Sequence, residues 1–188
     1  MLIEENNDPF RDPPVLQDYM SQWDGPLFLE AMKLNGTKRV LEVGVGTGRL
    51  AAKVLPDCLH FTGIDISPKT IERAKENLAN YTNVELICAD FSRHTFRGTF
   101  DVIYSSLTMM HFKDKQQFIQ KVDELLCDEG IFCLSIDKST SEYIDMGTRK
   151  VEIFPDTLEG TTSTIKSSSM KIAEILETEL AYIFVCTK

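Results

Sequence analysis

The sequence predicts an α/β protein with a mostly parallel sheet and helices on both faces. From Arg39 onward, short apolar runs rich in β-branched residues alternate with segments of helical periodicity, the pattern of strands joined by right-handed crossovers. Near the C-terminus, the strand-like runs 171–177 and 180–187 follow each other with almost no residues between them. No crossover fits there, so these two strands must form an antiparallel hairpin.

Each element is expected from its own local pattern. The expected strands of the repeating part are 39–43, 60–65, 84–88, 100–105 and 131–137. Helices are expected at 48–55, at 68–78 behind a Ser67-Pro68 start signal, and at 114–126. Residues 138–147 read as a polar loop, followed by a short strand at 150–154 and a helix within 155–168.

The N-terminal part differs in composition from the rest. Residues 1–14 are acidic and proline-containing and cannot order themselves alone. Apolar residues at helical spacing between Val15 and Met32 predict two short helices, the second starting at Pro26. We therefore divide the chain into an N-terminal segment, 1–36, expected to form a lid over a site, and a main domain, 37–188.

The composition limits the classes of function. A length of 188 residues with 43% hydrophobic and 26% charged residues is ordinary for one globular domain. A net charge of -9 argues against a nucleic-acid partner. Neither a membrane-spanning apolar run nor a basic-then-apolar leader is apparent, so we expect a cytoplasmic protein with no membrane partner. The oligomeric state stays unknown.

The cysteines do not indicate a metal site or disulfides. The five are scattered without a C-x-x-C pair, and Cys88, Cys133 and Cys186 lie in strand-like apolar runs, where cysteine behaves as a small hydrophobe. Cys58 and His60 lack a second ligand pair at a useful spacing. We expect no metal and reduced thiols.

A glycine-rich turn follows the first expected strand. Gly44, Gly46 and Gly48 stand at alternate positions before a helix. Glycine accepts positive φ and lacks a side chain, so such a turn brings bare backbone amides against a ligand. Many α/β proteins contain a turn of this kind, so the residues around it must decide which ligand it serves.

Three carboxylates, those of Glu42, Asp65 and Asp90, lie at or just after the ends of successive strands. Strand ends of an open α/β sheet line the ligand site, and a carboxylate about 20 residues after the glycines suits a ribose diol. A dinucleotide would use Asp65 too, but Arg49 replaces the third glycine of G-x-G-x-x-G. Glu42 would also repel a pyrophosphate, since like charges ~4 Å apart cost roughly 4 kcal/mol at a dielectric of 20. A cationic adenosyl ligand fits better.

These motifs together resemble class I S-adenosylmethionine-dependent methyltransferases, closely over residues 40–133 and again in the terminal hairpin. The resemblance implies a Rossmann-like sheet of seven strands, ordered 3-2-1-4-5-7-6 with strand 7 antiparallel. It also implies that Asp65 binds the ribose with Ile66 against the adenine, and that Asp90 binds the adenine amino group with Phe91 beside it. The implied cofactor-binding residues are Glu42, Gly44, Gly46, Thr47, Gly48, Asp65, Ile66, Asp90, Phe91, Ser105 and Leu107.

The acceptor side is less defined. The resemblance places 105–111 near the reacting methyl, where His111 is a candidate general base or a merely structural histidine. Tyr19, Trp23, Tyr104 and Asp137 are candidates for lining the acceptor pocket, although Tyr19 and Trp23 suit simple packing equally well.

We expect a methyltransferase acting on a small molecule. A non-catalytic protein that binds the cofactor or its demethylated product, a methyltransferase of a protein substrate and, more distantly, a dinucleotide oxidoreductase stay open.

Overall fold

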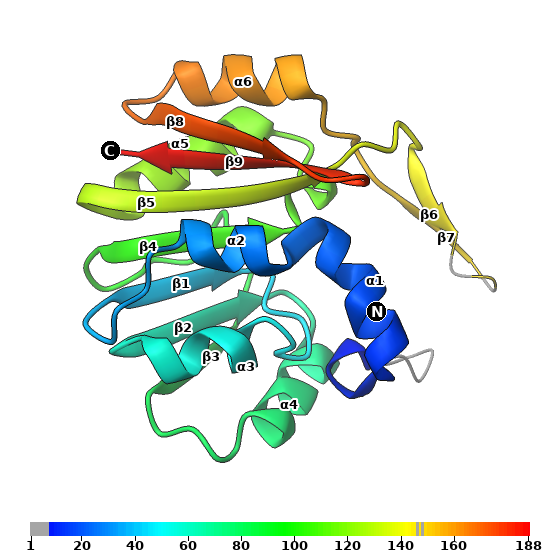
Figure 1. Cartoon of the computed structure of the whole chain (residues 1–188), viewed down its shortest axis with the longest axis vertical. Coiled ribbons are helices and arrows are strands. Elements are labelled where there is room, and N and C mark those ends of the chain that lie inside the picture. The colour runs from blue at the N-terminus through cyan, green and yellow to red at the C-terminus, as the bar shows by residue number, and fades with distance from the viewer. Residues whose placement is uncertain (1–7, 146, 148) are drawn as a thin grey trace.

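The computed structural model describes residues 8–145, 147 and 149–188. Its main sheet has seven strands in the order β3-β2-β1-β4-β5-β9-β8 (Figure 1). These strands are β1 (Arg39–Val43), β2 (His60–Asp65), β3 (Val84–Cys88), β4 (Phe100–Ser106), β5 (Leu126–Asp137), β8 (Lys171–Glu177) and β9 (Ala181–Thr187). Neighbours from β3 to β5 run parallel, and β9 runs antiparallel to both β5 and β8. When only the strands of this sheet are numbered along the chain, their order is 3-2-1-4-5-7-6. The predicted strand order and the predicted hairpin are therefore confirmed.

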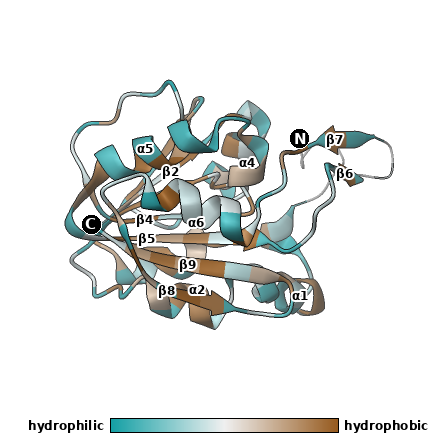
Figure 2. Ribbon diagram, turned by 90° about the horizontal axis from the view of Figure 1, so that it is seen from above, coloured by the Kyte–Doolittle hydropathy of each residue, from teal (hydrophilic) through white to brown (hydrophobic). Residues whose placement is uncertain are grey.

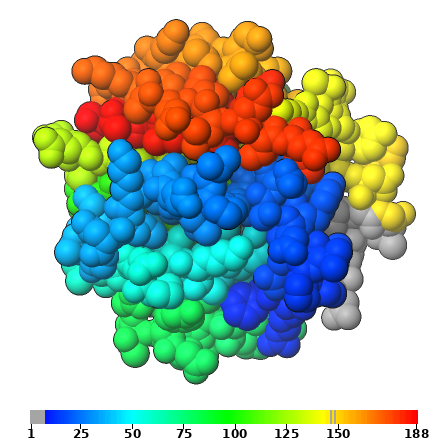
Figure 3. Space-filling view, viewed as in Figure 1, coloured from blue at the N-terminus to red at the C-terminus, as the bar shows by residue number. Residues whose placement is uncertain are grey.

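Helices cover both faces of the sheet. They are α1 (Pro14–Asp24), α2 (Pro26–Ala31), α3 (Ala51–Val54), α4 (Pro68–Asn77), α5 (Lys115–Leu125) and α6 (Leu158–Lys166), with 3-10 turns η2 (Pro9–Arg11), η3 (Leu55–Asp57) and η4 (Met109–His111). Side chains of α2, α3 and α4 form one apolar core with the sheet, and those of α5 and α6 form a second core on the opposite face. Figure 2 shows the strands as a hydrophobic layer between α5 and α2. In Figure 3 the N-terminal helices form a blue band across the front surface.

Local signals placed several boundaries correctly. The Ser67 hydroxyl accepts a hydrogen bond from the Thr70 amide at 3.4 Å and caps α4, while Asp114 caps α5. The helix expected at 48–55 is shorter, because the turn at Gly48 has a φ of +92° and delays α3 to residue 51. β5 starts earlier than expected, because Leu126 already pairs with Phe100 ahead of a shift in register.

The expected loop at 138–147 contains a strand. β6 (Tyr143–Asp145) pairs antiparallel with β7 (Lys150–Glu152), and this small hairpin projects from the main sheet (Figure 1). We call the described residues of this region, 138–145, 147 and 149–156, the β6–β7 arm. Within the described ranges, no helix has the length and apolar character needed to cross a bilayer.

Candidate active site

The glycine turn connects β1 to α3 through three residues with positive φ. Gly44, Gly46 and Gly48 have φ values of +84°, +55° and +92°. A Cβ at Gly44 would lie 2.1 Å from the Thr108 hydroxyl oxygen, so the turn packs directly on the segment after β4. A Cβ at Gly46 would meet nothing within 4 Å. Bare backbone therefore faces open space at Gly46, as a ligand cradle requires.

Asp65 lies at the end of β2 against this turn. One carboxylate oxygen accepts a hydrogen bond from the Gly46 amide at 3.2 Å, and the other accepts one from the Ser67 amide at 2.9 Å. The side chain is half-buried, and the neighbouring Ile66 side chain is 71% exposed. Because each carboxylate oxygen has two lone pairs, Asp65 retains acceptor capacity for a ligand.

Glu42 is buried beneath the turn, with 3% of the residue exposed. The Tyr104 hydroxyl donates a hydrogen bond to its carboxylate at 2.8 Å. Burial raises the pKa of Glu42 well above its usual range, although the Tyr104 hydrogen bond and the positive charge of Arg49 oppose the rise. Tyr104 itself is fully buried in the core, so the prediction that it lines the acceptor pocket is wrong. It orients Glu42 instead.

A buried ion pair that the sequence did not indicate joins the N-terminal segment to the glycine turn. Asp24, at the end of α1, is fully buried and accepts hydrogen bonds from both terminal nitrogens of the Arg49 guanidinium, that from Nη1 at 2.9 Å. Ser106, at the end of β4, donates a third hydrogen bond to Asp24 at 2.9 Å. Asp24 thus connects α1, the glycine turn and β4, and its charge is balanced by Arg49.

Asp90 and Phe91 follow β3. Asp90 is half-buried, accepts a hydrogen bond from the Ser92 amide at 2.9 Å and lies 3.6 Å from the Arg93 guanidinium. The Phe91 ring is buried, with its centroid 5.4 Å from that of Phe118 in α5. The Phe91 side chain therefore belongs to the apolar core between the sheet and α5.

The segment after β4 is held close to β1 and β5. Ser105 is fully buried and donates a hydrogen bond to the Val43 carbonyl at 3.0 Å, so its side chain fastens two strands rather than facing a ligand. Leu107 has a φ of +52°, and its amide donates to the Ser135 carbonyl at 3.3 Å. This conformation turns the chain sharply at the end of β4.

His111 ends η4 in the same segment, and its side chain is exposed. Its pKa is lowered by partial desolvation and by the positive charge of Lys115, whereas the charge of Asp65 acts in the opposite direction. A lowered pKa keeps the imidazole neutral near pH 7, the form that can accept a proton.

Comparison with known proteins identifies the family. Residues 41–134, half of the chain, match a family described as a methyltransferase domain. This chain belongs to that methyltransferase domain family. A malonyl-[acyl-carrier protein] O-methyltransferase of Bacillus anthracis is 34% identical over 103 residues, covering 54% of this chain and 38% of that protein. A 2-methyl-6-phytyl-1,4-hydroquinone methyltransferase of Synechocystis is 29% identical over 138 residues, covering 67% of this chain and 42% of that protein. The chain spans less than half of the length of either relative.

A solved structure shows the same fold over the whole domain. The N-methyltransferase NodS of Bradyrhizobium japonicum, in complex with S-adenosyl-L-homocysteine, superposes with a TM-score of 0.73. The superposition covers 98% of this chain and 94% of that chain, with 17% identity. The methyltransferase fold predicted from the sequence is therefore confirmed.

In this methyltransferase domain, the end of α1 lies over the ends of β4 and β5. The Ser135 hydroxyl donates a hydrogen bond to the Trp23 carbonyl. The Trp23 residue is 9% exposed, whereas the Tyr19 residue is 56% exposed and meets the Trp23 ring edge-on at 5.2 Å between centroids. Asp137, at the end of β5, is half-buried and accepts a hydrogen bond from the Ser139 amide at 2.9 Å.

Lys115 fastens the β6–β7 arm of the methyltransferase domain to η4. Its ammonium group donates hydrogen bonds to the Met109 carbonyl at 2.6 Å and to the Phe154 carbonyl at 2.8 Å. It also pairs with the buried carboxylate of Asp156 at 2.7 Å. Burial lowers the pKa of Lys115 and raises that of Asp156, while their mutual attraction opposes both shifts. The arm is thus fastened to η4, the turn that ends in His111.

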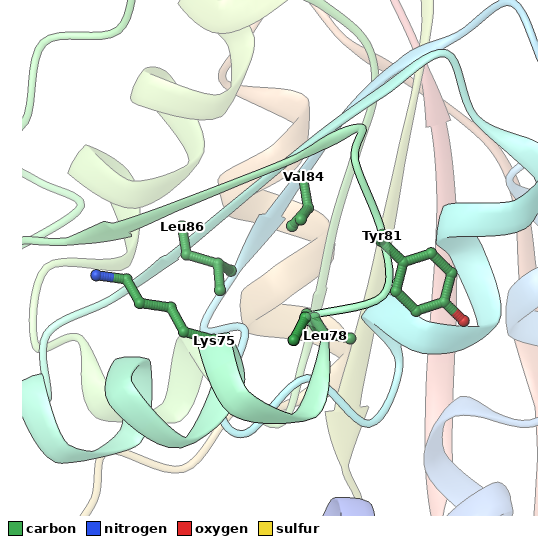
Figure 4. A pocket seen from close by; sticks show the side chains of 6 residues that line it. Lys75, Leu78, Tyr81, Val84 and Leu86 are labelled. Atoms are coloured by element: carbon green, nitrogen blue, oxygen red, sulfur yellow. The ribbon is translucent and has the colours of Figure 1, made fainter.

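Other features lie outside the site of the methyltransferase domain. A cavity of about 200 Å³ between α4 and β3 is lined by Lys75, Leu78, Ala79, Tyr81, Val84 and Leu86, which include none of the predicted site residues (Figure 4). Among the described residues, no group of three or more His, Cys, Asp or Glu side chains is arranged to hold a metal ion. Cys133 and Cys186 are buried as expected, but Cys88 is exposed because β3 is an edge strand.

Proposed function

We propose that this chain is an S-adenosylmethionine-dependent methyltransferase with a small-molecule acceptor. The observation that carries the proposal is the hydrogen bond between the Gly46 amide of the glycine turn and the Asp65 carboxylate. The space beside Gly46 is open, and the Glu42 carboxylate is buried beneath the turn. Bare amides, a ribose-binding carboxylate and a second carboxylate suited to a cation match the three parts of this cofactor. Membership in the methyltransferase domain family supports the same assignment.

The residues present fit the cofactor by their chemistry. The Thr47 hydroxyl is buried within the turn and has no hydrogen-bond partner among the described residues, so a polar ligand group would satisfy it. Asp65 has free lone pairs for the two ribose hydroxyls, and the exposed Ile66 offers an apolar surface to the adenine. Asp90 is assigned to the adenine amino group.

Glu42 is assigned to the positively charged methionine part of the cofactor. Arg49 is neutralised by Asp24, so the main partner of the Glu42 carboxylate is the neutral Tyr104 hydroxyl. A buried carboxylate without a full counter-charge favours a cationic ligand. The same feature disfavours a pyrophosphate, which separates this proposal from a dinucleotide oxidoreductase.

The chain's own groups act mainly by positioning. S-adenosylmethionine supplies an activated methyl group when bound, and in-line placement of the acceptor accounts for much of the rate in such a transfer. The ends of β4 and β5, the Trp23 end of α1 and η4 surround the position of the acceptor. We assign His111 as the proton acceptor when the acceptor atom carries a proton.

Isothermal titration calorimetry with S-adenosylmethionine and S-adenosylhomocysteine tests the proposal. We expect both to bind the unmodified chain, and Asp65→Ala to weaken binding at least tenfold, about 1.4 kcal/mol, because the ribose hydrogen bonds are lost. The matched control is Asp128→Ala, which removes an exposed carboxylate in β5 and should bind the cofactor normally. Absence of binding to the unmodified chain would refute the cofactor assignment.

Catalysis is tested separately by incubating S-adenosylmethionine with a panel of small metabolites and measuring release of S-adenosylhomocysteine. Turnover with a metabolite supports an enzyme with a small-molecule acceptor. Cofactor binding without turnover on any metabolite, but with methylation of a protein extract, would instead indicate a protein substrate.

A further inference from the structure

One face of α1 carries apolar side chains exposed to solvent. Val15, Leu16 and Tyr19 are 77%, 48% and 56% exposed. Val15, Tyr19 and Trp23 recur every four residues, so they lie along one side of the helix. We call Val15, Leu16, Tyr19 and Trp23 the α1 apolar face. It leads from three exposed residues to the buried ring of Trp23.

The Trp23 end of this face lies over the strand ends where the family's ligands are expected. Asp24 accepts a hydrogen bond from Ser106 of β4, and Trp23 accepts one through its carbonyl from Ser135 of β5. Ser106 and Ser135 are directly paired across these two strands. Ligands of open α/β sheets bind outside such strand ends. The α1 apolar face therefore starts at the acceptor side of the site and extends outward.

Most of the exposed large apolar side chains among the described residues lie at this end of the molecule, although Leu27 of α2 and Ile175 of β8 are exposed as well. Figures 1 and 2 both place α1 and the β6–β7 arm at the end of the sheet to which the parallel strands point. Tyr143 of the arm is 44% exposed. Ile66 at the same end is assigned to the cofactor, which leaves the α1 apolar face and Tyr143 for the acceptor. The exposed Leu59 precedes β2 and so lies at the opposite end.

Trp23 supplies an independent sign of a ligand. Its indole Nε1–H is buried and has no hydrogen-bond partner among the described residues. The ring belongs to neither of the two apolar cores and packs edge-on against Tyr19. A buried donor without a partner is unfavourable, and an oxygen of a bound molecule would satisfy it.

We propose that the acceptor is an uncharged amphiphile: its oxygen-bearing head accepts the Trp23 Nε1–H, and its apolar tail lies along the α1 apolar face. The inference rests on the proposed function and adds the class of acceptor. An anionic head is disfavoured because Asp65, Asp137 and Glu42 lie at the neighbouring strand ends. The apolar side chains would then bury tail surface that water otherwise meets.

The probes for the test are straight-chain 1-alkanols from butanol to octanol, titrated into the chain saturated with S-adenosylhomocysteine. Trp23 is the single tryptophan of the sequence, so its fluorescence reports binding at the proposed position. We expect affinity to rise with chain length, by up to about fourfold for each added methylene that is fully buried.

Variants separate the tail contact from the head contact. Val15→Ser and Tyr19→Ser should flatten the dependence of affinity on chain length, whereas the matched control Leu59→Ser should leave it unchanged. Trp23→Phe, followed by calorimetry because the fluorophore is lost, should weaken all the alkanols by a similar factor and keep the chain-length dependence. These opposite patterns distinguish a ligand site from a general loss of folding.

Some results would overturn the inference. Affinity independent of chain length, or an unchanged dependence in Val15→Ser and Tyr19→Ser, would show that the α1 apolar face does not hold the tail. A concentration-dependent dimer in sedimentation that Val15→Ser dissociates would assign the face to a second copy of the chain. If the same samples bind S-adenosylhomocysteine normally, these results reject only the proposed class of acceptor. If the unmodified chain does not bind S-adenosylhomocysteine, the proposed function itself is rejected.

Discussion

At the ends of β1 and β2 the site is built from backbone and short carboxylates, whereas at the ends of β4 and β5 it is built from the N-terminal segment. Asp65 and Gly46 meet through a loop and a strand that are neighbours in the sheet. Asp24 and Trp23, in contrast, accept hydrogen bonds from Ser106 and Ser135, which are distant from them in the chain. The first region follows from the order of the strands in the sheet, while the second depends on side-chain contacts between residues that are far apart in the sequence.

The two regions are joined at Asp24, and the largest expected effect comes from removing its charge. Asp24→Ala leaves the Arg49 guanidinium, whose side chain is 11% exposed, without its counter-charge. Breaking a buried ion pair in this way costs about 3–5 kcal/mol, which urea unfolding followed by circular dichroism can measure. We also expect weaker binding of S-adenosylhomocysteine, because Arg49 is part of the glycine turn.

The control for this prediction is the ion pair Lys138–Glu177, whose charged groups are 2.7 Å apart and in which the Glu177 side chain is 63% exposed. Glu177→Ala should cost less than about 1 kcal/mol, because solvent screens this pair. The double variant Asp24→Asn/Arg49→Met should recover part of the lost stability. Normal cofactor affinity in a folded Asp24→Ala variant would mean that the two regions act independently.

A second contact joins the regions through Gly44 and Thr108. Gly44→Ala places a Cβ 2.1 Å from the Thr108 hydroxyl oxygen in a residue with a φ of +84°. We expect a loss of about 2–3 kcal/mol, of which about 1–2 kcal/mol is the cost of the left-handed backbone. Gly36→Ala isolates that backbone cost, because Gly36 has a φ of +78° and nothing within 4 Å of its added Cβ. Equal losses of stability in the two variants would show that the Gly44–Thr108 contact contributes nothing to the effect.

The same division explains what the sequence could predict. The bounds of β1, β2 and β3 agree with the expected ones, because a strand and its flanking turn are recorded in consecutive residues. Asp65 and Gly46 were placed together because the order of strands in this fold brings them together. The order of the strands therefore predicts where the cofactor region lies without any knowledge of side-chain packing.

The acceptor region could not be predicted in the same way. Asp24 is separated by 25 residues from Arg49 and by 82 from Ser106, and no local pattern records those pairings. In the sequence, Asp24 stands only two residues before Pro26, where the second helix is expected, and nothing else marks it. Tyr104 was misjudged for a related reason: alternation along β4 leaves open which face it occupies, and only the packing of α2 and α3 buries it against Glu42.

Glu42 gives the smallest expected effect and the sharpest test of the electrostatics in the cofactor region. Burial raises its pKa, with the charges of Asp24 and Asp65 adding to the rise and Tyr104 and Arg49 opposing it. A bound cation favours the ionised carboxylate, so the affinity for S-adenosylmethionine should increase as pH rises and level off above the pKa of the free protein. The increase is at most about tenfold per pH unit, measurable by calorimetry between about pH 5 and about pH 8.

Glu42→Gln provides the contrast that makes this pH dependence specific. The amide keeps the size of the side chain and can still accept the Tyr104 hydrogen bond, but it cannot ionise. We expect the affinity of this variant to be lower above the pKa of Glu42 by about tenfold, about 1.4 kcal/mol, and to vary little with pH. If the variant keeps the full pH dependence, the titrating group lies elsewhere, and His111 becomes the residue to replace. If the affinity of the unmodified chain falls as pH rises, Glu42 does not face the cationic part of the ligand. The cofactor would then be bound by Asp65 and the glycine turn alone.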